Sequence, residues 1–182
     1  MYNKEWYNKL RKEYKPSEIK CLLIAESPPK SEGGRFFYNP DQEKYDFLFR
    51  SVMEVIFTDF KVKYRRGQKR IYLQKFKEKG FYLIDAVDEP INDKNQRERN
   101  KIIKRNLENK IREIDELISK DTPIILIKKN IFKIFHPELK RRGFNVIHNK
   151  PIPFPSSGQQ SKFKEKFKRC LEKISNTIEN SR

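Results

Sequence analysis

The sequence has few cysteines and no long run of apolar residues. Its two cysteines, Cys21 and Cys170, are far apart and in no metal-ligand spacing, which argues against a disulfide framework and a structural zinc site. No apolar run approaches the length needed to cross a bilayer, and residues 1–6 lack the uncharged stretch of a signal peptide. We therefore expect a soluble, cytoplasmic protein with no membrane partner.

Acidic residues are too few to balance the basic ones. The 182 residues include 42 Lys and Arg against 25 Asp and Glu, a net charge of +17. Such a charge repels itself unless an anionic partner is bound, so nucleic acid is the first partner to consider. Apolar residues make up 36% and come in compact blocks, which favours a folded chain. The length predicts one domain spanning residues 1–182.

Short apolar runs alternate with segments of helical spacing. Four runs have the length of a buried strand: residues 20–25, 81–87, 123–127 and 144–148. Apolar residues three or four apart predict helices over residues 45–57, 97–120, 130–142 and 161–178. The basic stretch 61–70 is expected to be a loop, either partly mobile or facing DNA. This alternation predicts an α/β fold, a three-layer α/β/α sandwich around a four-stranded, mainly parallel sheet.

Ligands of such sheets bind beyond the carboxyl ends of the strands. Glu26 directly follows the first run and precedes Ser27 and two prolines, so its carboxylate is held near that edge, where it can orient water or stabilise a cation. The alternative is an ordinary exposed glutamate at a strand end. Asp85, near the end of the second run, is a further candidate at the same edge.

Two loops have the composition of a nucleic-acid site. Residues 33–38 place two glycines beside Arg35 and three aromatic rings, an arrangement able to present a ring for stacking on a base. Alternatively, each ring plugs the end of the sheet. Residues 151–160 carry hydroxyls, amides and backbone N–H groups at a helix start, which suit a phosphate. The alternative there is an ordinary loop in which Ser161 is the N-cap.

Taken in order, these segments resemble the uracil-DNA glycosylase superfamily over residues 20–171. Residues 25–29 (AESPP) are similar to its water-activating motif, and residues 34–37 (GRFF) to its base-stacking loop. Residues 83–87 (LIDAV) resemble its base-reading strand, with Asp85 where the family has Asn. Residues 154–157 (FPSS) resemble its last DNA-clamping loop, with Phe154 where the catalytic His would be.

The resemblance implies a monomeric DNA glycosylase of base excision repair, acting on single- or double-stranded DNA without metal or cofactor. In this interpretation Glu26 is the catalytic residue that orients water to cleave the N-glycosidic bond of a flipped, damaged or deaminated base. The base would be held by Phe37, Asp85, Ser27 and Phe154. The DNA would be contacted by Pro28, Lys30, Arg35, Ser156, Ser157, Gly158 and Gln159, and the residue that wedges into the duplex would be Gln159 or Gln160.

Two departures from the family pattern leave the chemistry open. Ionised Asp85 only accepts hydrogen bonds, whereas uracil needs a donor and an acceptor. It could read a donor-rich base edge, donate while held neutral by its pocket, or simply cap a helix or orient water. Phe154 removes a donor to the departing base, unless His148 or Asn149 supplies one. His136 is interpreted as a cap or surface residue.

Two other functions compete with the glycosylase. The first is a nucleic-acid-binding protein that keeps the fold but has lost catalysis, which the residues at positions 85 and 154 favour. The second is a hydrolase of free nucleosides or nucleotides, which the net charge of +17 disfavours.

Overall fold

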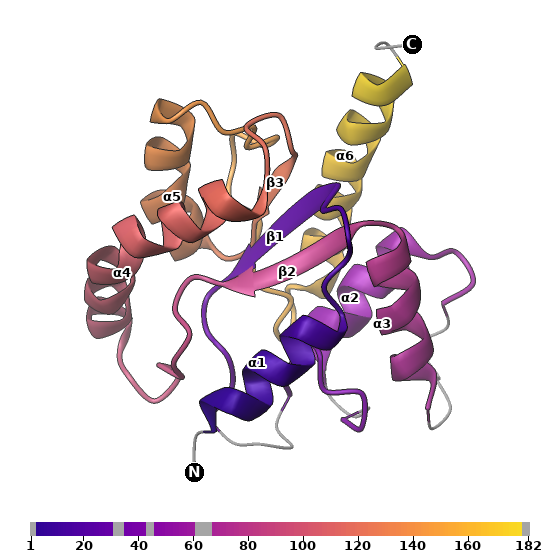
Figure 1. Ribbon diagram of the computed structural model, residues 1–182, viewed down its shortest axis with the longest axis horizontal. Helices are drawn as coiled ribbons and strands as arrows, with labels where there is room; N and C mark the ends of the chain where they lie inside the picture. The colour runs from indigo at the N-terminus through magenta and orange to yellow at the C-terminus, as the bar shows by residue number, and fades with distance from the viewer. Residues whose placement is uncertain (1–2, 31–34, 43–45, 61–66, 180–182) are drawn as a thin grey trace.

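Three parallel strands form the centre of the protein (Figure 1). This computed structural model describes residues 3–30, 35–42, 46–60 and 67–179. The strands are β1 (Cys21–Ala25), β2 (Phe81–Asp85) and β3 (Ile124–Leu126), in the spatial order β2-β1-β3. In this register Ala25 lies beside Asp85, so the chain leaves β1 and β2 at the same edge. An α/β fold with a parallel sheet is thus confirmed.

The sheet has three strands in the described part of the chain, and the expectation of four was wrong. Residues 144–148 make an isolated bridge between Val146 and Ile124 and no strand. Beyond that bridge the His148 side chain takes the place of a partner backbone, because its Nε2 accepts the Leu126 N–H at 2.9 Å. His148 Nδ1 lies 2.9 Å from the Lys150 carbonyl oxygen. Burial lowers the pKa of His148 to about 4, so the ring is neutral and serves the fold.

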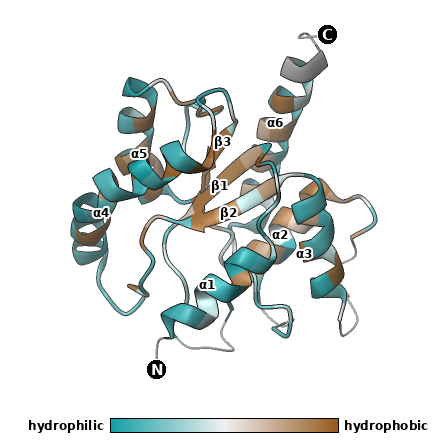
Figure 2. Ribbon diagram, in the orientation of Figure 1, coloured by the Kyte–Doolittle hydropathy of each residue, from teal (hydrophilic) through white to brown (hydrophobic). Residues whose placement is uncertain are grey.

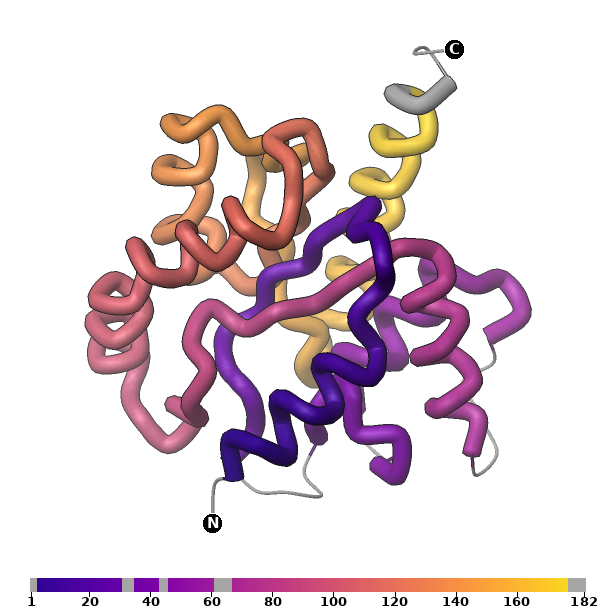
Figure 3. The backbone as a smooth tube through the Cα atoms, viewed as in Figure 1, coloured from indigo at the N-terminus to yellow at the C-terminus, as the bar shows by residue number. Residues whose placement is uncertain are grey.

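Helices cover both faces of the sheet (Figures 1 and 3). Four begin and end near their predicted limits: α2 (Phe47–Ile56), α4 (Gln96–Leu117), α5 (Lys129–Arg141) and α6 (Gln160–Glu179). The start of α4 follows from a capping box in which Asn95 and Glu98 satisfy each other's backbone N–H groups. Helices α4 and α5 pack together on one side of the sheet, whereas α2 packs against α6 on the other.

Two helices lie where no helix was predicted. Helix α1 (Lys4–Glu13) buries Tyr7, Leu10 and Arg11. Helix α3 (Gln68–Glu78) begins inside the basic stretch 61–70, so residues 68–70 are helical and not part of a loop. Lys69 is fully buried there, although a mobile or DNA-facing segment would expose it. The rest of that stretch, residues 61–66, is outside the described residues.

Apolar residues concentrate in the strands and on the inner faces of the helices (Figure 2). All five residues of β1 are buried, as expected of a central strand covered on both faces. None of the helices in the described ranges is long and apolar enough to cross a membrane.

Candidate functional site

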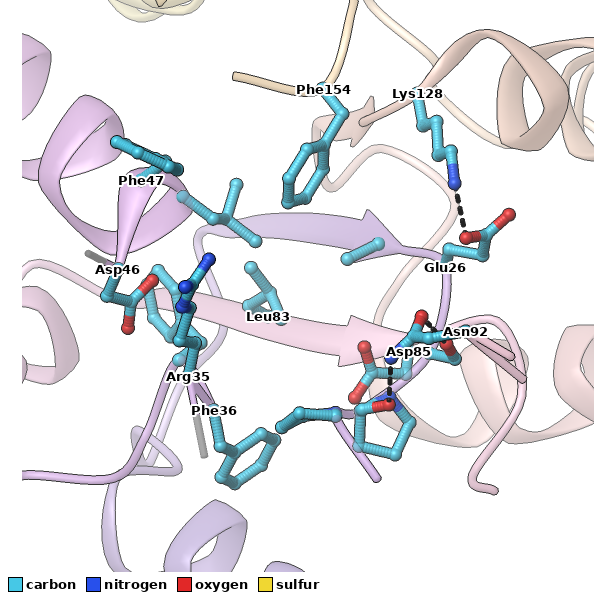
Figure 4. A pocket seen from close by; sticks show the side chains of 16 residues that line it. Glu26, Arg35, Phe36, Asp46, Phe47, Leu83, Asp85, Asn92, Lys128 and Phe154 are labelled. Carbon is cyan, nitrogen blue, oxygen red and sulfur yellow. Dashed lines mark hydrogen bonds and ion pairs between the residues drawn. The ribbon is translucent and has the colours of Figure 1, made fainter. Parts of the chain in front are cut away.

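A cavity of about 290 Å³ opens at the carboxyl ends of β1 and β2 (Figure 4). Seven of the residues predicted for the site line it: Glu26, Ser27, Pro28, Arg35, Phe37, Asp85 and Phe154. The other five are described but do not line it: Lys30, Ser156, Ser157, Gly158 and Gln159. Seven of the twelve predicted residues thus lie together in one cavity, whose walls come from segments far apart in the chain.

Glu26 is held in place by three side chains, two from the start of α5 and one from α4. It is 7% exposed, and its Oε1 accepts a hydrogen bond from Asn130 Nδ2 at 2.6 Å. Its Oε2 forms an ion pair with Lys128 and lies 3.5 Å from Arg99 Nη1. Lys128 has a φ of +89° at the start of α5, and it lines the cavity with Glu26. The carboxylate is thus fixed in orientation and surrounded by positive charge.

Asp85 is paired with an arginine from α1. Its Oδ2 lies 2.6 Å from Arg11 Nη2, and both side chains are almost completely buried. Burial raises the pKa of Asp85, while the Arg11 charge opposes that rise. Arg11 also lies over the Phe36 ring, 5.2 Å from its centroid. Helix α1 therefore supports the cavity from behind Asp85.

The aromatic residues after Arg35 are part of the core. Phe36, Phe37 and Tyr38 are each at most 3% exposed. The Phe37 ring packs against Tyr38, Phe49 and Phe76. Phe37 nevertheless lines the cavity, so its predicted stacking on a base remains a prediction. Phe154 is 36% exposed, and Figure 4 shows its ring directed toward β1.

A third acidic side chain, Asp46, lines the cavity and was not predicted to. Its Oδ1 caps α2 by accepting the Phe49 N–H, and its Oδ2 lies 2.5 Å from Lys69 Nζ. Lys69 also donates to the Phe36 carbonyl oxygen at 3.1 Å. This buried ion pair ties α2 and α3 to the aromatic segment that forms one wall.

The remaining predicted contacts lie near the rim or farther away. Ser27 Oγ donates to Asn92 Oδ1 at 3.1 Å, and Lys30 forms an exposed ion pair with Asp93. Ser156, Ser157, Gly158 and Gln159 are exposed in the turn before α6. These positions leave their predicted DNA contacts as predictions. Gly34 is outside the described residues.

Sequence reasoning missed Arg11, Asp46 and Lys69, each of which supports the cavity through a buried ion pair or hydrogen bond. The available signal was helical spacing. Tyr7, Leu10 and Arg11 are three or four residues apart, as are Lys69, Tyr72 and Leu73. In both helices a buried cation occupies a position of the apolar stripe.

The chain matches no protein-family model, no curated protein and no solved structure. Fold and cavity define a mixed α/β protein with a ligand-sized pocket at the carboxyl edge of a parallel sheet, the usual place for a binding site in such folds.

Proposed function

We propose that the cavity holds a base flipped out of DNA and that the protein hydrolyses the N-glycosidic bond of that base, as a DNA glycosylase of the uracil-DNA glycosylase type. The observation that carries this proposal is the meeting of Glu26, Phe37, Asp85 and Phe154 in one cavity. Four separate segments supply these residues, in the order that the resemblance requires. At about 290 Å³ the cavity is near the lower end of ligand pockets, roughly 300–1,000 Å³, which suits one base.

Glu26 is suited to orient the attacking water. A carboxylate offers about four acceptor sites, and the contacts with Lys128, Asn130 and Arg99 take about three of them, which leaves about one for a water. Cleavage of the C1′–N bond passes through a sugar resembling an oxocarbenium ion, which a fixed carboxylate stabilises. The ion pair with Lys128 holds the Glu26 carboxylate in place for both tasks.

The net charge of +17 supplies the affinity for the DNA phosphates in this proposal. Both cysteines are free and buried, as is common in a reducing compartment, so we place the protein in the cytoplasm.

The experiment that tests the function uses purified protein and oligonucleotides with single uracil, hypoxanthine, xanthine or N-methylated bases, in single and double strands. Alkali cleavage detects abasic sites. We expect abasic sites from at least one substrate, and at least about a hundredfold slower formation of them when Glu26→Gln replaces the wild type. Salt-sensitive binding without abasic sites from any substrate would refute the glycosylase.

The second candidate is a protein that binds a flipped base without cleaving it. The contacts of Glu26 favour this candidate. Lys128 pairs with one carboxylate oxygen and Asn130 donates to the other, as in a structural ion pair. Phe154 also brings no donor to a departing base. In this case neither the wild type nor Glu26→Gln forms abasic sites above the spontaneous background.

A further inference from the structure

Carboxylates outnumber cations among the residues that line the cavity, although the protein as a whole is strongly basic. Three carboxylates line it, those of Glu26, Asp46 and Asp85, with two cations, Arg35 and Lys128. The cations that pair with Asp46 and Asp85 are Lys69 and Arg11, and neither is among the described residues that line the cavity. Both pairs therefore have their negative end at the cavity and their positive end behind it.

Asp85 presents an acceptor to the ligand. Arg11 Nη2 bonds to Oδ2, and no hydrogen bond to Oδ1 is seen from the described residues. A carboxylate oxygen accepts from an amino or ring N–H group and is repelled by a carbonyl. Aromatic rings complete the wall, among them Phe36, Phe47 and Phe154, and the faces of such rings attract cations.

The donor that a catalytic histidine would supply to a departing anion is missing from this wall, whose cations are Arg35 and Lys128, the latter paired with Glu26. Phe154 has no hydrogen-bond donor, and both nitrogens of the neutral His148 are engaged with the backbone. A neutral base such as uracil leaves as an anion and needs a donor to stabilise it. A base that already carries a positive charge leaves as a neutral molecule and needs none.

We propose that the cavity selects a positively charged, N-alkylated base that keeps an amino group, with Asp85 accepting from that amino group. This inference rests on the proposed function, because it names the substrate class of that site. In the reaction, water oxygen bonds to C1′ as the C1′–N bond breaks. The electron pair of that bond moves to the ring nitrogen and cancels its positive charge, while the proton of the water passes by way of Glu26 to solvent.

The first test measures chemistry. Methylated DNA and uracil-containing DNA are incubated with the protein, and the released free bases are measured against the spontaneous loss seen without protein. We expect release of charged methylated bases at a rate at least about a hundredfold above that of uracil, the range that one missing donor accounts for. Release of uracil at a comparable rate would overturn the inference about the substrate class, whereas the proposed glycosylase activity would stand.

The second test measures binding alone and does not depend on catalysis. Titration of guanosine and of its ring-methylated, positively charged derivative is followed by protein NMR. We expect the charged nucleoside to bind at least about tenfold more tightly, as for a hydrogen bond to a charged group. Equal affinities would overturn the inference even if abasic sites form. If no DNA is cleaved, the proposed function fails and this titration still decides the selectivity.

A variant connects the selectivity to Asp85. Asp85→Asn is combined with Arg11→Gln so that no buried cation is left unpaired. We expect this double variant to bind both nucleosides alike while keeping the wild-type circular dichroism spectrum. A folded double variant with an undiminished preference would show that Asp85 does not select the base.

Discussion

Lys69→Met tests whether the buried ion pair behind the cavity holds α2, α3 and the aromatic wall together. The side chains of Lys69 and Asp46 are 0% and 2% exposed, and Lys69 Nζ lies 2.5 Å from Asp46 Oδ2. Removing one partner leaves a buried carboxylate without its counter-ion, which costs about 3–5 kcal/mol of the free energy of unfolding. For a chain of this size the melting temperature should fall by roughly 6–20 °C. Urea denaturation and thermal melts, followed by circular dichroism, measure both quantities.

The neighbouring residue provides a matched control. Arg70 is 58% exposed and forms looser ion pairs with Glu13 and Asp41, so Arg70→Met should cost less than about 1 kcal/mol. The double variant Lys69→Met with Asp46→Asn should recover much of the lost stability, because no charge then remains buried. If Lys69→Met costs no more than Arg70→Met, the reasoning about this pair is refuted.

Three further predictions concern single positions. Burial lowers the pKa of His148 from 6.5 to about 4, so between these pH values the unfolded chain binds a proton that the folded chain does not. The free energy of unfolding should therefore fall by about 3 kcal/mol as the pH drops from 6.5 to 4. Urea titrations at several pH values measure this dependence, and His148→Gln should flatten it. Gly80 has a φ of +77°, and a Cβ added there would lie 2.7 Å from Lys20 Cγ. Gly80→Ala should therefore destabilise the fold by more than the roughly 1–2 kcal/mol expected for Gly67→Ala, where nothing lies within 4 Å of an added Cβ. Equal losses of stability in thermal melts would contradict this prediction. Phe154→His should add a donor for the departing base and raise uracil release by up to about a hundredfold in the abasic-site assay, and an unchanged rate would show that residue 154 does not face the leaving group.

The elements that could be predicted are those whose apolar pattern lies within one segment of the sequence. The runs 20–25 and 81–87 contain β1 and β2, because strand residues buried on both faces of a sheet make an uninterrupted apolar run. Helix α4 could be located from its amphipathic spacing alone. The prediction of Glu26 and Asp85 at one edge followed from the parallel order of β1 and β2.

The missed parts depend on contacts between distant residues. Residues 144–148 look like a strand, but His148 bonds to β3 through its side chain and ends the ladder after one bridge. Lys69 looks like a solvated residue of a basic loop, and its burial depends on partners distant in the sequence, above all Asp46, 23 residues earlier. Arg11 likewise reaches Asp85 across 74 residues. Composition cannot reveal such pairs, because an isolated cation favours the surface.

The central claim is hydrolysis of an N-glycosidic bond with Glu26 orienting water, and one single-turnover measurement tests it most directly. Wild type and Glu26→Gln, each in excess over a labelled oligonucleotide with one N-methylated base, are compared for abasic-site formation and for DNA affinity. Lys128, the ion-pair partner of Glu26, keeps a 24% exposed side chain, so the variant should fold and bind DNA as the wild type does. The account predicts cleavage by the wild type and a loss of about 10²–10⁴-fold in the variant. Equal cleavage rates above the spontaneous background, or no cleavage by either protein, would contradict it.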